Sequence, residues 1–156
     1  MTEFQRIQTL PTNALAALLA TSTAEGFRFV ERFAREWEDD KARFDGPGQL
    51  FLAAYDGATV IAVGGLTPDP YSGDPALGRL RHLYVRPDAR HRGIGRRLVQ
   101  ALERAAQGKY RALVLRTDTA TAARFYEELG YTPLPPGGTA THRRELPAQT
   151  SVRLHP

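Results

Sequence analysis

The chain has 156 residues, 42% of them hydrophobic and 24% charged, which is typical of a globular protein and fits one domain, residues 1–156, with a single buried core. It contains no cysteine, which excludes disulfide scaffolds, thiolate metal sites and cysteine nucleophiles. The N-terminal residues do not resemble a signal peptide, and no run approaches the ~18 apolar residues of a membrane span, so we expect a cytoplasmic protein without a membrane partner.

The N-terminal part is predicted to form one short strand and two helices. Residues 4–7 are a candidate edge strand, and Thr12 can cap a helix that has one apolar stripe. Gly26 ends that helix, and residues 30–37 repeat the helical spacing of apolar side chains. We expect the two helices to pair as a hairpin on one side of a sheet.

Two apolar runs, residues 50–55 and 59–66, are predicted to be adjacent antiparallel strands. The Asp56-Gly57 pair between them is a strong hairpin signal. The Gly64-Gly65 pair inside the second run indicates either a bulge or a place where a ligand passes close to the backbone. Residues 67–77, rich in proline and glycine, are predicted to form a loop that could border a substrate.

The chemistry is expected to lie in residues 79–97, which read R-L-R-H-L-Y-V-R-P-D-A-R-H-R-G-I-G-R-R. Residues 80–85 are typical of a half-buried strand, which Pro87-Asp88 ends, and a glycine-rich turn then leads into a helix. Gly93 and Gly95 lack a Cβ, so the main chain there can turn sharply and come close to a bulky ligand. Because the first N–H groups of a helix have no internal partner and the helix dipole adds positive charge, an anion binds readily at such a turn.

The positive charge of the protein is concentrated in the same stretch. The formal net charge is +4, and residues 79–97 hold seven of the 21 Lys and Arg residues but only one of the 17 Asp and Glu residues, Asp88. Local basicity indicates a compact polyanionic ligand. A long nucleic acid needs a wider basic face, so a nucleic-acid partner is the weaker alternative.

The second half of the chain is predicted to alternate between helices and strands. The helix that follows the glycine turn leads to residues 112–117, a buried strand expected to lie roughly parallel to residues 80–85. Asp118 or Thr119 caps the next helix, which Gly130 ends.

The C-terminal part is predicted to contain a final pair of strands, residues 132–134 and 141–146, divided by Pro135-Pro136-Gly137-Gly138. The basic run His142-Arg143-Arg144 either meets an acidic acceptor or forms a solvated edge. The tail after Pro147 is expected to be loose.

Two motifs resemble those of one enzyme family. Arg90-x-x-Gly93-x-Gly95 resembles the Q/R-x-x-G-x-G/A signature of the GNAT superfamily of N-acetyltransferases, and it lies between a strand and an amphipathic helix, as it does in that family. The later run F-Y-E-E-L-G-Y, residues 125–131, resembles the family's F-Y-E-K-L-G-F at the expected distance. The resemblance covers residues 50–131 well and the two ends poorly.

The resemblance implies an α/β (α+β) fold, in which helices flank a central mixed, mostly antiparallel sheet. Its fourth and fifth strands would part to form the cofactor cleft. The implied activity is transfer of an acetyl group from acetyl-coenzyme A (acetyl-CoA) to a primary amine of a small molecule or peptide, by direct attack in a ternary complex. Family members are often dimers, which leaves a homodimer open.

The same resemblance implies which residues contact the cofactor. Main-chain groups of the central strand would pair with the pantetheine arm like an added strand, and those of the turn would hold the pyrophosphate. The expected cofactor-binding residues are Leu83, Tyr84, Val85, Arg90, His91, Arg92, Gly93, Ile94, Gly95, Arg96, Asp118 and Thr119. The side chains of Arg90, Arg92 and Arg96 could add charge-assisted contacts to phosphate. Asp118-Thr119 stands where an asparagine is common in the family.

Tyr126 matches the family tyrosine that assists departure of the coenzyme A sulfur as a general acid. The reference pKa values, about 8.5 for a thiol and about 10 for tyrosine, make this role reasonable without a large shift. The alternative is a core aromatic, because Tyr126 adjoins the apolar stripe of its helix.

His82 is the best candidate for the base that takes the proton of the attacking amine. By the alternation of strand side chains we expect it to share a face with Leu80 and Tyr84. A partly buried structural histidine, with an ordered water as the base, is the alternative. Many family members have a glutamate near the start of this strand, where this chain has Arg79.

Several other functions are disfavoured by spacing. A dinucleotide fold needs a third glycine where Leu98 stands, a P-loop needs Gly-Lys followed by Ser or Thr, and the four histidines show no metal-ligand spacing. A non-catalytic acyl-CoA-binding or sensor domain stays open. So do the acceptor, the base, the length of the acyl group and the oligomeric state.

Overall fold

The computed structural model describes residues 2–7, 12–26, 35, 44 and 46–147. The second predicted helix, over residues 30–37, lies outside the described residues apart from Arg35. The C-terminal tail from residue 148 lies outside them as well.

Seven strands form one sheet in the order β1-β2-β3-β4-β5-β7-β6. The strands are β1 (Thr2–Arg6), β2 (Leu50–Asp56), β3 (Thr59–Pro68), β4 (Leu77–Val85), β5 (Ala112–Leu115), β6 (Thr132–Pro133) and β7 (His142–Glu145). Among the described strands β4 and β5 are the one parallel pair, and the other neighbours are antiparallel. The predicted mixed, mostly antiparallel sheet is confirmed.

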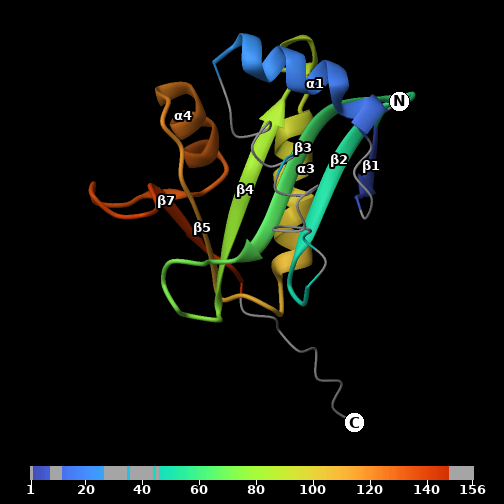
Figure 1. Ribbon diagram of the computed structural model, residues 1–156. Helices are drawn as coiled ribbons and strands as arrows, with labels where there is room; N and C mark the ends of the chain where they lie inside the picture. Colours follow the sequence, from blue (N-terminus) through green and yellow to red (C-terminus); the bar gives the residue numbers. More distant parts are fainter. Residues whose placement is uncertain (1, 8–11, 27–34, 36–43, 45, 148–156) are drawn as a thin grey trace.

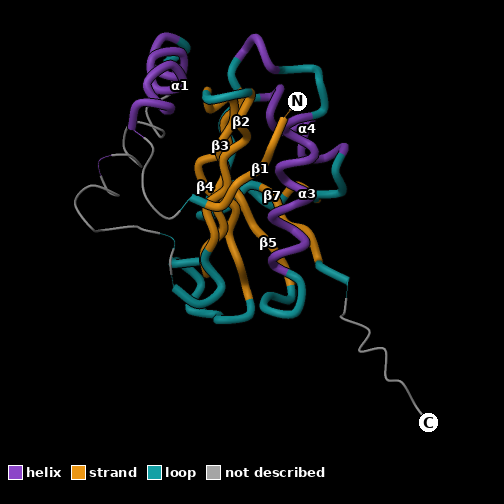
Figure 2. The backbone as a smooth tube through the Cα atoms, turned by 90° about the vertical axis from the view of Figure 1, so that its right-hand side faces the viewer, coloured by secondary structure: helices purple, strands orange, loops and turns teal. Residues whose placement is uncertain are grey.

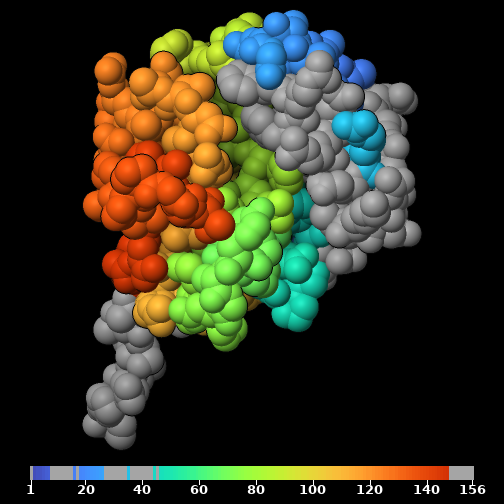
Figure 3. Space-filling model, turned by 60° about the vertical axis from the view of Figure 1, so that its left-hand side comes forward, coloured from blue at the N-terminus to red at the C-terminus, as the bar shows by residue number. Residues whose placement is uncertain are grey.

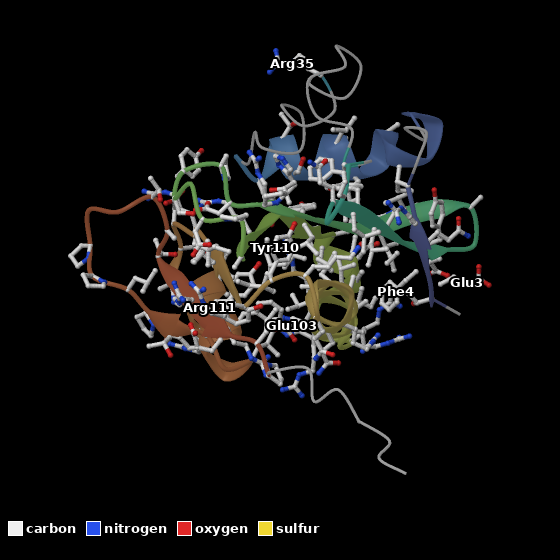
Figure 4. The ribbon with its side chains drawn as sticks, turned by 90° about the horizontal axis from the view of Figure 1, so that it is seen from below. Glu3, Phe4, Arg35, Glu103, Tyr110 and Arg111 are labelled. Carbon is white, nitrogen blue, oxygen red and sulfur yellow. The ribbon has the colours of Figure 1, made fainter. Side chains whose placement is uncertain are left out.

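Helices cover both faces of this sheet. The helix α1 (Thr12–Ala24) lies on one face, and α3 (Ile94–Ala106) and α4 (Ala120–Glu128) lie on the other, as Figures 1 and 2 show. Viewed from below in Figure 4, the sheet separates α1 from α3, with Glu103 on the α3 side. The two faces are called the α1 face and the α3 face below.

Each face has its own apolar core. On the α3 face, Leu98 and Leu102 are fully buried against strand residues such as Leu113, which confirms that this helix is amphipathic, as predicted. On the α1 face, Leu18 packs with a cluster that includes Phe44. Burial of two faces explains why the central strands are almost continuously apolar instead of alternating.

Several predicted boundaries are wrong by a few residues. The strand β3 continues to Pro68 and β4 already begins at Leu77, so the loop between them is residues 69–76 and not 67–77. The strand β5 ends at Leu115. The extra strand residues escaped prediction because β3 and β4 pair through Pro68↔Gly78, beyond the point where their apolar pattern stops.

The fourth and fifth strands part, as predicted. Parallel pairing of β4 with β5 runs from Leu77↔Ala112 to Arg79↔Val114 and then ends, whereas β4 continues to Val85. The last six residues of β4 therefore keep a partner strand on the β3 side alone.

A bulge lies in this part of β4, which pairs with β3 but not with β5. Its register with β3 passes from Gly65↔Arg81 to Val63↔Tyr84, so two residues of β4, His82 and Leu83, stand opposite Gly64 alone. His82 has a φ of 57°, in the left-handed region that residues with a Cβ rarely adopt. The Gly64-Gly65 pair thus marks a bulge in the partner strand. A Cβ on Gly64 would lie 2.8 Å from Leu83 Cδ1, so neighbouring side chains fill the space near this glycine.

Leu98→Ala should lower the free energy of unfolding by about 2–5 kcal/mol, because it leaves a cavity where α3 packs on the sheet. Chemical denaturation measures the change. The matched control is Gln100→Ala, an exposed position on the same helix, which should change stability by less than about 0.5 kcal/mol. Equal effects of the two substitutions would contradict this packing.

Candidate active site

The turn between β4 and α3 presents a row of main-chain N–H groups. His91 and Gly93 have φ values of 65° and 74°, and Gly93 is the residue that caps the N-terminus of α3. In the part of the chain that the structure describes, no acceptor is found for the N–H groups of residues 91–96. The turn therefore offers an anion several free donors at the positive end of α3.

The two glycines of the turn serve different purposes. Gly93 has open space where a Cβ would lie, so glycine is favoured there by the left-handed backbone and not by a lack of space. A Cβ on Gly95 would lie 3.3 Å from Phe125 Cζ and 3.4 Å from Val85 Cγ2. Gly95 thus allows α4, the start of α3 and the end of β4 to pack closely together.

Glu25 connects the end of α1 to this turn. Its carboxylate accepts hydrogen bonds from Arg90 Nη1 and Nη2 at 2.9 and 2.7 Å, and another from the Tyr84 hydroxyl. Arg90 Nε also donates to the Val85 carbonyl at 2.9 Å, and its guanidinium lies 5.5 Å from the centre of the Tyr84 ring. The first arginine of the turn motif is therefore bound within the protein.

This network shifts the pKa values of its members. The hydrogen bond from Arg90 lowers the pKa of Glu25 below its ordinary 4.5, and the Tyr84 hydroxyl adds to that effect. Burial, together with the hydrogen bond to Glu25, raises the pKa of Tyr84. At neutral pH the carboxylate is charged and the phenol is neutral, so the hydrogen bonds have matching donors and acceptors.

Two further arginines of the turn are available to a ligand. Arg92 and Arg96 are exposed and have no acid or hydrogen-bond partner among the described residues. By contrast, Arg86 pairs with Asp88 at 2.7 Å. The cations nearest to the free N–H groups are thus the ones left unpaired.

Tyr126 is buried on α4, where 7% of it is exposed. Its ring meets those of Phe125 and Tyr131 edge-on, with centroids 5.0 and 5.7 Å apart. Burial raises the pKa of Tyr126 well above the ordinary value of 10. The neutral form, which can donate a hydrogen bond, is favoured throughout the physiological range.

The bulge corrects the expected facing of His82. Leu80 belongs to the α3 face, whereas Tyr84 belongs to the α1 face. The His82 ring meets Phe44 of the α1 face edge-on, with centroids 6.0 Å apart. His82 therefore shares a face with Tyr84 but not with Leu80, because the bulge interrupts the alternation on which the prediction depended.

Arg79, which stands where many family members have a glutamate, is buried in an ion pair. Its Nη1 lies 3.1 Å from Asp69 Oδ1, and its Nη2 donates to the Thr139 carbonyl at 2.7 Å. The guanidinium also lies 4.8 Å from the centre of the Tyr71 ring. Arg79 thus joins the β3–β4 loop to the β6–β7 loop.

The surface is hollowed over β4. Figure 3 shows the hollow with yellow-green atoms of the β4 region at its floor, α1 above it, and the β3–β4 loop below it. The orange atoms of α4 and the following segment form one side. The elements β4, α1, α4 and the β3–β4 loop therefore border one depression.

The predicted alternatives at the start of α4 are decided by geometry. The Thr119 hydroxyl accepts a hydrogen bond from the Ala122 N–H at 3.1 Å, so Thr119 is the cap. Asp118 is exposed and lies 3.5 Å from Arg116 Nε.

The basic run near the C-terminus is not a solvated edge. His142 is 4% exposed, with Nε2 2.9 Å from Glu127 Oε2. Arg144 donates to Glu103 Oε2 at 2.9 Å. These side chains bind α3 and α4 to β7, and sequence alone could not find their acids, which lie 15 and 41 residues away.

Sequence reasoning also missed Glu25 and Asp69. They lie 65 and 10 residues from the arginines that they bind, and neither belongs to a motif. No group of three or more His, Asp or Glu side chains that could hold a metal ion occurs among the described residues. In the same residues, no helix combines the length and the apolar character needed to cross a membrane.

Comparison with known proteins identifies the family. The profile of the acetyltransferase (GNAT) domain matches residues 47–133. A crystal structure from Exiguobacterium sp. 255-15 is 32% identical, with a TM-score of 0.83 and 93% of each chain covered. The chain belongs to the GNAT acetyltransferase family. A search of curated proteins found no match.

Two more distant structures share the fold and contain coenzyme A. The PaiA N-acetyltransferase from Thermoplasma acidophilum, in complex with coenzyme A, is 19% identical with a TM-score of 0.69, and 93% of this chain and 99% of that chain are covered. The GNAT family N-acetyltransferase YhbS from Escherichia coli, also in complex with coenzyme A, is 19% identical with a TM-score of 0.67, covering 94% of this chain and 82% of that one.

The ion pair of Glu25 and Arg90 should have a small but measurable coupling. Its side chains are 28% and 36% exposed, so a double-mutant cycle of Glu25→Gln and Arg90→Gln should give about 0.5–1 kcal/mol by chemical denaturation at neutral pH. Because the folded pKa of Glu25 is lowered, the coupling should be complete above pH 4.5 and disappear as the pH falls through that lowered pKa. A coupling that grows on acidification would contradict the ion pair.

Proposed function

We propose that the whole chain acts as one N-acetyltransferase domain that moves an acetyl group from acetyl-CoA to a primary amine of a small molecule or peptide. The observation that carries this proposal is the row of free N–H groups at residues 91–96, beside a strand that has lost its partner, in a GNAT-family chain. The coenzyme A complexes of the related folds from Thermoplasma acidophilum and Escherichia coli support the choice of cofactor.

The pyrophosphate of the cofactor would bind to the N–H groups of residues 91–96, with Arg92 and Arg96 adding charge-assisted contacts. The pantetheine arm would lie along Leu83–Val85, on the side of β4 that β5 leaves uncovered. Arg90 acts by holding the Val85 carbonyl and Glu25, and not by binding phosphate through its side chain. Asp118 and Thr119, which follow β5, would contact the cofactor through the main chain.

The reaction is direct attack on the thioester. The lone pair of the neutral amine forms a bond to the carbonyl carbon, and the carbon–sulfur bond then breaks. The sulfur leaves as a thiolate, to which the Tyr126 hydroxyl donates a proton or a hydrogen bond. The products are an acetamide and coenzyme A. The raised pKa keeps the Tyr126 hydroxyl neutral, so it can donate a hydrogen bond to the sulfur as negative charge develops there, and it favours that hydrogen bond over full proton transfer.

The proton that the amine loses would pass to His82 or to an ordered water. The bulge in β4 supports His82, since it places the imidazole on the α1 face, where the hollow opens, and not against α3. A left-handed φ at a residue other than glycine costs free energy, and such positions cluster at functional sites.

Tyr126→Phe should lower kcat by about 100-fold or more, because it removes the proton donor while keeping the buried ring. The measurement follows free thiol released from acetyl-CoA in the presence of a panel of amines. The KM for acetyl-CoA should change little.

The matched control is Tyr55→Phe, a half-buried tyrosine on β2, which should keep wild-type turnover. Wild-type turnover in Tyr126→Phe would contradict the assigned acid. Thermal stabilisation by coenzyme A without thiol release from any amine would instead indicate a domain that binds acyl-CoA and does not catalyse.

Arg92→Gln and Arg96→Gln should each weaken coenzyme A binding by about 3- to 10-fold, because each removes a cation beside the pyrophosphate. Calorimetric titration measures the affinity. Turnover of acetylpantetheine, which lacks the phosphates, should be unchanged in both variants. Arg104→Gln, an exposed position in the last turn of α3, is the control that should leave both quantities unchanged. If either substitution lowered activity equally with acetyl-CoA and with acetylpantetheine, the arginine would not act on the phosphates.

A further inference from the structure

One cation of the arginine-rich stretch is left without a role by the proposed function. Arg79, Arg86 and Arg90 each pair with an acid, and Arg97 lies over the ring of Phe4. Arg92 and Arg96 border the turn. The remaining arginine, Arg81, is half-buried on β4 and has neither an acid nor a hydrogen-bond partner within the described chain.

Arg81 lies too far from the turn to serve the phosphates. It precedes Val85 by four residues, which is about 13 Å along a strand at roughly 3.3 Å per residue. The turn at residues 91–96 lies beyond that end of β4. Its charge therefore acts in another part of the cleft.

The register of the sheet shows on which face the Arg81 side chain lies. Its partner on β3 is Gly65, and a Cβ built on Gly65 would lie 2.8 Å from Phe44 Cε1 on the α1 face. Paired residues of neighbouring strands point to the same face. Arg81 thus emerges on the face of the hollow, and the bulge places the next residue, His82, on that face too. A regular strand could not present two consecutive side chains in this way.

The described carboxylates bordering this region are already paired. Asp69 binds Arg79 and accepts a hydrogen bond from the Ser72 N–H at 3.0 Å, and Glu25 binds Arg90. Among the described residues, the unpaired charge in this region is therefore the positive charge of Arg81. A second cation beside a half-buried guanidinium is unfavourable, so a polyamine fits poorly.

A second polar group without a partner among the described side chains lies on the same face as Arg81. Among the described side chains, Thr67 Oγ1 is the buried polar atom for which no hydrogen bond is found, and 9% of the residue is exposed. Thr67 pairs with Arg79 on the neighbouring strand, so it lies on the same face as Arg81, two residues farther along β3 than Gly65. An unsatisfied buried hydroxyl costs free energy unless a ligand or water completes it.

We propose, on the basis of the acetyltransferase activity above, that the acceptor is an amine that also carries a carboxylate a few bonds away, as a free amino acid does. Arg81 binds the carboxylate, with the Thr67 hydroxyl as a second donor, and this places the amine beside His82. The carboxylate takes no part in the bond changes: the amine gains the acetyl group and loses its proton, and coenzyme A leaves as the thiol. Arg81 is thus the residue that selects the acceptor.

The test compares free amino acids with their carboxamides, which keep the amine and lose the negative charge, and with a diamine. Wild-type kcat/KM should be at least tenfold higher for the free amino acids than for the carboxamides. Arg81→Gln should lower that preference by about 10- to 100-fold, through the KM for the amino acid, while the KM for acetyl-CoA stays the same. Arg81→Lys should restore part of it, and Arg104→Gln should behave as wild type.

Equal wild-type rates with carboxamides or the diamine would overturn the acceptor class while leaving the acetyltransferase activity standing. The same holds if Arg81→Gln slows both kinds of amine equally. If no amine releases thiol, the proposed activity fails, and calorimetric titration of free amino acids into the protein loaded with coenzyme A decides the carboxylate site separately. Binding by wild type that Arg81→Gln abolishes supports the site, and no binding by wild type overturns it. Unchanged melting temperatures establish that the variants are folded.

Discussion

The candidate site depends on β4 losing its parallel partner partway along its length. Up to Arg79 the strand is paired on both sides, and beyond it β4 has no partner strand on the β5 side among the described strands. Because the bulge lies in this same segment, the strand also changes which side chains it presents. Strand parting and the pair Arg81-His82 thus come from one short segment of β4, which leads into the turn with its free N–H groups.

Some arginines of the basic stretch pair with acids of the protein itself, and others are left without such a partner among the described residues. Three arginines of the basic stretch are neutralised by Asp69, Asp88 and Glu25, so the high count of cations in the sequence overstates the charge available to a partner. Among the described residues of this stretch, Arg92 and Arg96 stay unpaired at the turn and Arg81 stays unpaired in the middle of β4. This distribution fits two separate small anionic groups better than a long polyanion.

Local patterns predicted most of the fold and the turn. The hairpin at Asp56-Gly57, the amphipathic helix α3 and the glycines of the turn follow from rules that act within a few residues. The face of the sheet on which each β4 side chain lies could not be predicted. The bulge that determines it depends on Gly64 of a neighbouring strand and on its packing with Leu83. The partners of Arg90 and His142 were also out of reach, because ion pairs between distant segments leave no periodic signal.

The parting of β4 from β5 creates a strand edge inside the molecule instead of at its rim. Uncovered strand edges are templates for pairing with other chains, and natural sheets normally shield them. Here the shield would be the pantetheine arm, which supplies the missing row of hydrogen bonds. The cofactor would thus act as a structural part of the sheet, and resistance of the protein to aggregation should depend on how much cofactor the cell supplies.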